Sequence, residues 1–283
     1  MMSSIRILAG PVPSRRRVLR RVLGGACLAG ILLLAGPGVA GAGDTPSEAT
    51  WDSIRPDIFG QHVIDTEPTV TLSAPRRAED AALVPIEVHI NLPSGDARTV
   101  KAITLVVDEN PSPLVAVFKL GEGRRQFDLS TRIRVNSYSY VRAVSETSDG
   151  KLHMTKVFVK AAGGCSAPAG KDPAEAKANL GKMRFRDFTG TGSQEAQVQI
   201  RHPNYSGMQM DQVTRLYTPA WFVQTLAVSQ GDKPVFSMEG GISLSEDPTF
   251  RFSYEKNGQA VTVDVKDTEG NVFKRAFPAD GGS

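Results

Sequence analysis

One cysteine stands where its side chain could do chemistry. Cys165 lies in the stretch Lys160-Ala-Ala-Gly-Gly-Cys-Ser-Ala-Pro-Ala-Gly170, which has no bulky apolar residue around it. The only other cysteine, Cys27, falls in an N-terminal apolar run, so no disulfide partner is in view. A cysteine without a partner is a spare residue, a nucleophile or a thiol kept free for a purpose.

A catalytic nucleophile of the Cys-His type is the least favoured of these interpretations. Such a site needs a fixed thiol, a base within hydrogen-bond reach and donors for an oxyanion. The glycines before Cys165 predict a flexible loop instead. His89 and His153 fall inside predicted strands, and His62 stands alone before them. We therefore rank a cysteine-dependent hydrolase well below a carrier.

The third interpretation is a carrier arm with no turnover of its own. Gly163 and Gly164 would supply the flexibility of the arm, and the small residues beside the thiol would let it enter a narrow active site. At about 3.3 Å per residue, the thiol could extend roughly 16 Å from Lys160. Lys160 and Lys171 bracket a stretch without acidic residues, which predicts an exposed thiol with a modest bias towards thiolate.

Residues 1–42 have the organisation of an export signal. Ser14-Arg-Arg-Arg-Val-Leu-Arg20 fits the twin-arginine (Tat) pattern, an apolar run follows, and Ala40-Gly-Ala42 is a cleavage site of the A-x-A kind. The apolar run is shorter than the roughly 20 residues that a membrane span needs. We expect a periplasmic protein, cleaved near Ala42, with Cys27 discarded and no membrane contact after cleavage.

The charge of the chain changes once the predicted signal is removed. The full sequence has a formal charge of +3, but residues 1–42 hold six arginines and no acidic residue. The remaining chain carries 27 Lys and Arg against 30 Asp and Glu, a formal charge of −3. No basic patch therefore argues for nucleic acid as a partner.

The rest of the chain predicts two β-rich halves, residues 43–160 and 182–283. Both halves alternate short β-prone runs with turn signals, a spacing typical of immunoglobulin-like β-sandwiches. Before the strands of the first half, Trp51–Phe59 predicts a short helix that packs through Trp51, Ile54 and Ile58. The expected strands of the first half are Thr69–Ser73, Leu83–Leu92, Thr99–Val107, Leu114–Leu120, Arg124–Val135, Ser139–Thr147 and Leu152–Lys160. Those of the second half are Gln197–Arg201, Trp221–Ser229, Pro234–Met238, Thr249–Glu255, Ala260–Asp267 and Val272–Phe277.

Local signals refine the second half and the linker. Asn257-Gly258 predicts a tight hairpin, because a type I′ turn needs positive φ at both positions. His202-Pro-Asn-Tyr-Ser-Gly207 predicts the end of a strand turning into a loop, in preference to a role for His202 in contacting the arm or a partner. In the linker 161–181, Asp172 and Pro173 predict the start of a short helix, which Gly181 would end.

These features together resemble a known family. Gly-Gly-Cys at the end of an immunoglobulin-like domain resembles the swinging arm of SoxY, the sulfur carrier of bacterial thiosulfate oxidation, and the second half resembles its partner SoxZ. The resemblance is to a fused SoxY–SoxZ carrier of the type associated with quinoprotein dehydrogenases. The residues that resemble SoxZ are Ile200-Arg-His-Pro-Asn-Tyr-Ser-Gly207, Thr218-Pro-Ala-Trp-Phe222, Ile242-Ser-Leu-Ser-Glu-Asp-Pro-Thr-Phe250 and Asp267-Thr-Glu-Gly270.

The resemblance implies a function for Cys165. Thiosulfate-derived intermediates would be attached covalently to this thiol and presented to sulfur-oxidising enzymes and c-type cytochromes of the periplasm, or to a quinoprotein dehydrogenase. No metal and no cofactor besides the attached sulfur are expected. In the separate subunits the arm is a free C-terminal tail, whereas here Ser166-Ala-Pro-Ala follows and the chain continues. The alternative is a non-catalytic assembly module for a periplasmic quinoprotein (PQQ) dehydrogenase, in which the thiol is incidental.

Overall fold

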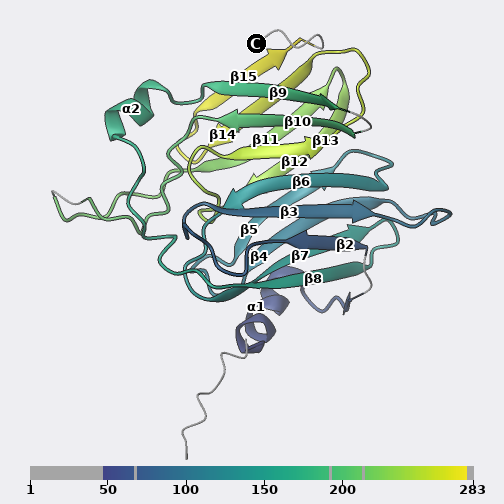
Figure 1. Cartoon of the computed structure of the whole chain (residues 1–283), viewed down its shortest axis with the longest axis horizontal. Coiled ribbons are helices and arrows are strands. Elements are labelled where there is room, and N and C mark those ends of the chain that lie inside the picture. The colour runs from purple at the N-terminus through teal and green to yellow at the C-terminus, as the bar shows by residue number, and fades with distance from the viewer. Residues whose placement is uncertain (1–46, 67–68, 191–192, 212–213, 279–283) are drawn as a thin grey trace, which may run out of the picture. The chain divides into compact units, whose positions relative to one another are not determined.

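The structure, a computed structural model, describes residues 47–66, 69–190, 193–211 and 214–278 (Figure 1). The predicted signal peptide, residues 1–42 with Cys27, lies outside this part of the chain. Within it, none of the helices has both the length and the apolar character that crossing a membrane requires.

The protein is all-β, with two immunoglobulin-like halves, as the alternating runs predict. Helix α1 (Ala49–Phe59) precedes the strands of the first half, and α2 (Pro173–Ala178) precedes those of the second. The first half holds β1 (Ile64–Asp65), β2 (Val70–Ser73), β3 (Val84–Asn91), β4 (Val100–Val107), β5 (Leu114–Leu120), β6 (Gln126–Ile133), β7 (Ser139–Thr147) and β8 (Leu152–Val159). The second holds β9 (Met183–Gly190), β10 (Ser193–Ile200), β11 (Val223–Gln230), β12 (Lys233–Gly240), β13 (Thr249–Ser253), β14 (Val261–Asp267) and β15 (Val272–Phe277).

Side-chain alternation decides which face of each strand is buried. In β3, Val84, Ile86 and Val88 are buried, and the residues between them are exposed. The same two-residue period buries Val261, Val263 and Val265 in β14. Because successive side chains of a strand point to opposite faces, this pattern turns one face of each sheet towards the core.

Both sheets run through both halves of the chain. The nine-stranded sheet has the order β1-β8-β7-β4-β5-β12-β11-β14-β15, and the six-stranded sheet has the order β2-β3-β6-β13-β10-β9. Figure 1 shows the six-stranded sheet in front, from β2 at the bottom to β9 at the top. The halves meet where β5 pairs with β12 and β6 pairs with β13, both antiparallel.

A cluster of phenylalanines fills the junction between the halves. Phe236 of the second half lies with its ring centroid 6.0 Å from that of Phe118 and 6.0 Å from that of Phe127, both of the first half. Phe250 and Phe252 of the second half complete the cluster. One continuous hydrophobic core therefore joins the two halves.

Sequence analysis missed one strand of the second half, and one of its predictions there is wrong. Strand β9 was not expected, although it pairs with β10 along its whole length. Asn257-Gly258 does not close a hairpin, because β13 pairs with β6 and β10, whereas β14 pairs with β11 and β15 in the other sheet. Only Gly258 of this dipeptide has positive φ, so the turn carries the chain from one sheet to the other.

The two predicted helices are present. Trp51 of α1 is buried in a small separate core, and Ile54 and Ile58 pack against that core. Asp172 caps α2, since its side chain accepts hydrogen bonds from the backbone of Ala174 and Glu175. The helix ends at Ala178, and Gly181 beyond it has φ 71°. Helix α2 thus begins directly after the segment that carries Cys165.

Candidate functional site

Cys165 is buried, and this corrects the expectation of an exposed arm. Its side chain is 0% accessible to solvent, and it is a free thiol. The residue lies in the loop between β8 and α2, and its glycines had predicted a loop at this place. The loop 161–171 is not a freely extended tether in this structure, because hydrogen bonds along its length attach it to the protein. We call this arrangement the docked loop.

The first half holds the docked loop through backbone hydrogen bonds. The amide of Gly163 donates to the carbonyl of Asn136 at 2.8 Å, and the amide of Gly164 donates to the carbonyl of Val135 at 3.1 Å. A Cβ atom on Gly164 would lie 2.1 Å from the carbonyl oxygen of Ala81, so a side chain does not fit there. In the docked loop, Gly164 allows close approach of the backbone. The contribution of Gly163 and Gly164 to mobility stays a prediction.

The second half holds the same loop from the other side. Ser206 Oγ donates a hydrogen bond to the carbonyl of Cys165, and Gln209 Nε2 donates to the carbonyl of Ala167 at 3.0 Å. Further along, Glu246 accepts a hydrogen bond from the amide of Gly170 at 3.0 Å. The thiol therefore lies between the halves, and residues of both must move for it to reach solvent.

Burial sets the protonation state of the thiol. Burial raises the pKa of Cys165 above its ordinary value, and the nearby positive charge of Arg134 opposes that rise without cancelling it. The expected bias towards thiolate is therefore wrong for the docked loop. Lys171, one of the two lysines on which that expectation rested, forms an ion pair with Asp247 instead. The docked Cys165 is a neutral thiol at neutral pH.

Arg134 is a charged residue that contacts the backbone next to the thiol. It directly follows β6, is 1% exposed, and donates from Nη1 to the carbonyl of Gly164 at 3.0 Å. Its Nη2 donates to the carbonyl of Asn204 at 3.2 Å, which joins the two halves through one side chain. Sequence reasoning missed Arg134, because a charged residue beside a strand is usually exposed.

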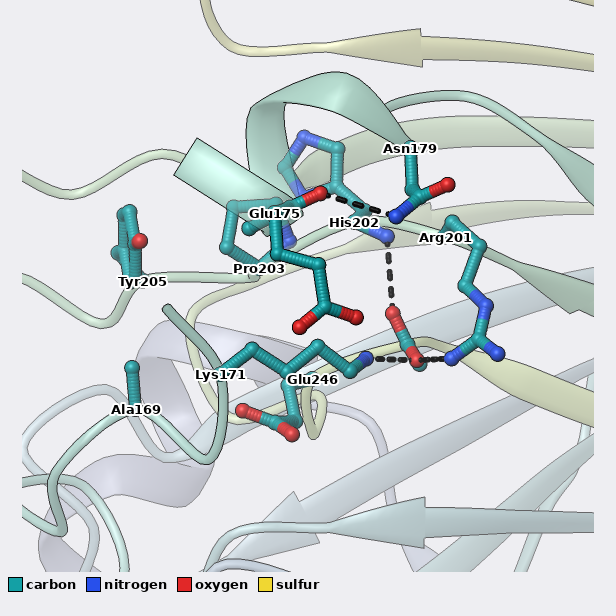
Figure 2. A pocket seen from close by; sticks show the side chains of 11 residues that line it. Ala169, Lys171, Glu175, Asn179, Arg201, His202, Pro203, Tyr205 and Glu246 are labelled. Carbon is teal, nitrogen blue, oxygen red and sulfur yellow. Dashed lines mark hydrogen bonds and ion pairs between the residues drawn. The ribbon is translucent and has the colours of Figure 1, made fainter. Parts of the chain in front are cut away.

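A small polar pocket lies under the C-terminal part of the loop (Figure 2). Its volume is about 90 Å³, and Figure 2 shows Lys171, Glu175 and Arg201 around it. Lys171 and Arg201 both form ion pairs with Asp247, so this carboxylate is already neutralised. Cys165 is not among the residues that line the pocket. The pocket is thus a neighbour of the docked loop and does not hold the thiol.

Strand β10 ends at Ile200 and the chain continues as a loop, as the preferred sequence interpretation predicts, and His202 of this loop belongs to a buried cluster. Its ring is 1% exposed, Nδ1 accepts the amide hydrogen bond of Asn204 at 3.0 Å, and Nε2 lies 3.4 Å from Asp267. Trp221 Nε1 also donates to Asp267 at 2.8 Å. Burial lowers the pKa of His202, so its ring is neutral. The cluster braces the segment that carries Ser206.

Two family models match consecutive parts of the chain. The model described as "Sulfur oxidation protein SoxY" matches residues 55–165, and the model described as "Sulphur oxidation protein SoxZ" matches residues 186–278. The chain carries a SoxY domain and a SoxZ domain in tandem. The SoxY match ends at Cys165, so the thiol is the last matched residue of that domain.

Comparisons with solved structures and curated sequences add little. The sulfur carrier protein SoxY from Chlorobium limicola f thiosulfatophilum is 26% identical, with a TM-score of 0.34, over 40% of this chain and 92% of that one. The superoxide reductase (neelaredoxin) from Ignicoccus hospitalis is 15% identical, with a TM-score of 0.28, over 32% of this chain and 79% of that one. No curated protein sequence matches the chain.

Residues of both domains form the site around the thiol. The SoxY domain provides the thiol, the glycines and Arg134, and the SoxZ domain provides Ser206 and Gln209. Ser206 lies in the SoxZ-like motif Ile200–Gly207, which is the sequence signal that could have indicated a role beside the cysteine. SoxY and SoxZ domains support a sulfur-oxidation carrier role for the fused chain.

Proposed function

We propose that this protein is a periplasmic carrier, exported by the Tat pathway, that holds thiosulfate-derived intermediates covalently on Cys165. It presents them to partner enzymes and has no turnover of its own. The observation that carries the proposal is that the SoxY match ends on Cys165, which is the free thiol of the described residues. The position of this thiol between two Sox domains also supports the proposal.

Burial of the thiol adds a step to the carrier cycle. A partner enzyme has to contact the sulfur atom of Cys165, and this residue is 0% exposed in the docked loop. The loop therefore opens before sulfur is loaded or transferred. Opening breaks the hydrogen bonds from Ser206, Gln209 and Arg134 to loop carbonyls. At a net value of about 0.5–1.5 kcal/mol each, these bonds hold the closed state by a few kcal/mol, which thermal opening can overcome.

The proposed partners are periplasmic sulfur-oxidising enzymes and c-type cytochromes, or a quinoprotein dehydrogenase. Because the loop is attached to the fold at both ends, its open form presents Cys165 at the tip of a bend. A partner therefore needs an active-site entrance wide enough for the two backbone segments that flank the cysteine. Ala162, Ser166 and Pro168 are already exposed beside the buried thiol. These small residues keep the opened bend narrow.

A second candidate is a non-covalent assembly module for a quinoprotein dehydrogenase. The specific observation in its favour is the burial of Cys165, which a protein with an incidental thiol would also show. The two candidates differ in one respect that can be measured. A carrier needs the sulfur atom of residue 165, whereas an assembly module needs only the surface of the fold.

The proposal is tested by intact-mass spectrometry on the protein purified from its native host, before and after treatment with a reductant. We expect a mature N-terminus near residue 43 and a mass excess that maps to the Cys165 peptide and disappears on reduction. The matched control is Cys165→Ser, which should show no excess while keeping the fold. A protein that remains a plain thiol in cells actively oxidising thiosulfate, with Cys165→Ser cells oxidising it normally, would leave only the assembly module.

A further inference from the structure

Among the described residues, Arg134 and Arg142 are buried, and their surroundings differ. Arg142 is 0% exposed and forms ion pairs with Asp108 and Glu48 at 2.7 Å and 2.6 Å. Arg134 is 1% exposed, and no carboxylate among the described residues lies within ion-pair distance of it. The positive charge of Arg142 is thus neutralised inside the fold, and that of Arg134 is not.

An unneutralised guanidinium in the interior is unfavourable unless something compensates its charge. Removing a charge from water is disfavoured by several kcal/mol, which an oppositely charged partner ordinarily offsets. Two nitrogens of Arg134 donate to the carbonyls of Gly164 and Asn204, and Nε has no hydrogen-bond partner. Glu246 and Asp80 act on Arg134 only through longer-range attraction. The side chain therefore has an unused donor and an unmatched charge.

The group beside this charge is the thiol. Arg134 Nη1 is bonded to the carbonyl of Gly164, the residue that precedes Cys165, and Cys165 is also buried. In the unloaded protein the thiol is neutral, so it does not match the charge of Arg134. An adduct that adds a negative charge to the sulfur would match it.

We propose that Arg134 is the positioning residue for an anionic sulfur adduct on Cys165, and that it keeps the loaded loop docked. The ligand class is a sulfur substituent with a permanent negative charge, such as an S-sulfonate, whose oxygens accept from Nε. This inference rests on the proposed function and names the residue that holds the cargo. Arg134 supplies charge and a hydrogen-bond donor and does not react with the sulfur.

The test compares a neutral and an anionic adduct on the same thiol. Methyl methanethiosulfonate converts the thiol to the neutral S-methylthio form, R–S–S–CH₃, with release of methanesulfinic acid. Sulfite then attacks the protein sulfur and gives R–S–SO₃⁻ with release of methanethiolate, so atoms and charge balance. Intact mass verifies each form before the measurement.

The readout is amide hydrogen exchange of the loop, because the amides of Gly163 and Gly164 are hydrogen-bonded only in the docked loop. Exchange is measured for both adducts in the wild type, in Arg134→Gln and in Arg134→Lys. For each protein, the rate of loop amide exchange in the S-sulfonate form is divided by the rate in the S-methylthio form. We expect this ratio to be at least tenfold lower in the wild type than in Arg134→Gln. Arg134→Lys, which keeps the charge, should lie between them. Equal ratios in all three proteins would overturn the proposal.

The ratio within each variant removes the general effect of losing the hydrogen bonds of Arg134 to the backbone. Lys119→Gln, an exposed change of charge on β5, is the matched control and should leave the ratio unchanged. If Arg134→Gln does not fold, urea unfolding of the two wild-type adducts decides. The proposal requires the S-sulfonate to be at least as stable as the S-methylthio form, and a lower midpoint for the S-sulfonate would refute it.

This experiment separates two kinds of failure. The adducts are made chemically, so coupling between Arg134 and the adduct is measured whether or not the native protein carries sulfur. Coupling without native loading would sink the proposed function and leave an anion site beside the thiol. Native loading without coupling would keep the carrier and remove Arg134 from its mechanism.

Discussion

Arg134 binds the carbonyl of Gly164 with Nη1 and the carbonyl of Asn204 with Nη2, at 3.0 Å and 3.2 Å. One side chain of the SoxY domain thereby connects the residue before the thiol to the segment of the SoxZ domain that carries Ser206. Docking of the loop is for this reason a joint property of both domains. Accessibility of Cys165 should respond to changes in either one.

Removing the hydrogen bonds from the SoxZ side should expose the thiol. In Ser206→Ala/Gln209→Ala, the carbonyls of Cys165 and Ala167 lose their side-chain donors. Two bonds of about 0.5–1.5 kcal/mol each correspond to a roughly 5- to 150-fold rise in the open population. The measurement is the rate of alkylation by iodoacetamide at fixed pH. Thr214→Ala, an exposed change on the same segment, is the control, and a double variant that reacts no faster than this control would count against the docked loop.

A single methyl group on Gly164 should open the loop from the SoxY side. The Cβ of Gly164→Ala would lie 2.1 Å from the carbonyl oxygen of Ala81 and 2.7 Å from that of Val135, and both contacts involve backbone that cannot shift easily. We expect at least a tenfold faster alkylation of Cys165, with the far-ultraviolet circular dichroism spectrum unchanged. Ala162→Ser, at an exposed position of the same loop, should behave like the wild type. Unchanged thiol reactivity in Gly164→Ala would contradict the close packing of the glycine.

The two domains should unfold as one unit. Phe236 is 1% exposed and contacts Phe118 and Phe127 across the junction, so Phe236→Ala should lower the free energy of unfolding by about 3–5 kcal/mol. Urea unfolding followed by tryptophan fluorescence and by hydrogen exchange of β3 and β14 should give coincident transitions. Tyr217→Ala, at a position that is 64% exposed, should change stability little. Separate transitions for the two domains would show that the shared sheets do not couple them.

The free energy of unfolding should decrease as the pH is lowered through the titration range of His202. Burial lowers the pKa of His202 in the folded protein below the ordinary value of 6.5. As the pH falls below about 6.5 the unfolded chain binds the proton first, so the free energy of unfolding decreases with decreasing pH. The loss continues until the pH reaches the lower pKa of the folded state.

His202→Gln isolates this contribution, because glutamine does not titrate. Urea midpoints of the wild type and the variant are compared at pH 7.5, 6.5 and 5.5. We expect the wild type to lose more stability than His202→Gln between the first and last of these pH values. Parallel pH profiles would mean that His202 is not held neutral by the fold.

Most of the secondary structure could be predicted from local patterns. The alternation of Ile86 and Val88 with polar neighbours indicated β3, and Asp172 with Pro173 indicated the start of α2. The pairing of the strands could not be predicted, since partners in a sheet are distant in sequence. Asn257-Gly258 illustrates the limit, because a strong hairpin signal joins two strands that belong to different sheets.

By itself, the sequence determined that this is an all-β chain with SoxY-like and SoxZ-like halves and with a lone thiol after Gly163-Gly164. These conclusions depend on residue type and spacing, which are local properties. Only the tertiary structure decided that the thiol is buried and neutral and that Arg134 lies beside it without a carboxylate. Burial and charge environment arise from contacts among residues 134, 164–165 and 204–209, and folding brings these residues together from both sides of the linker.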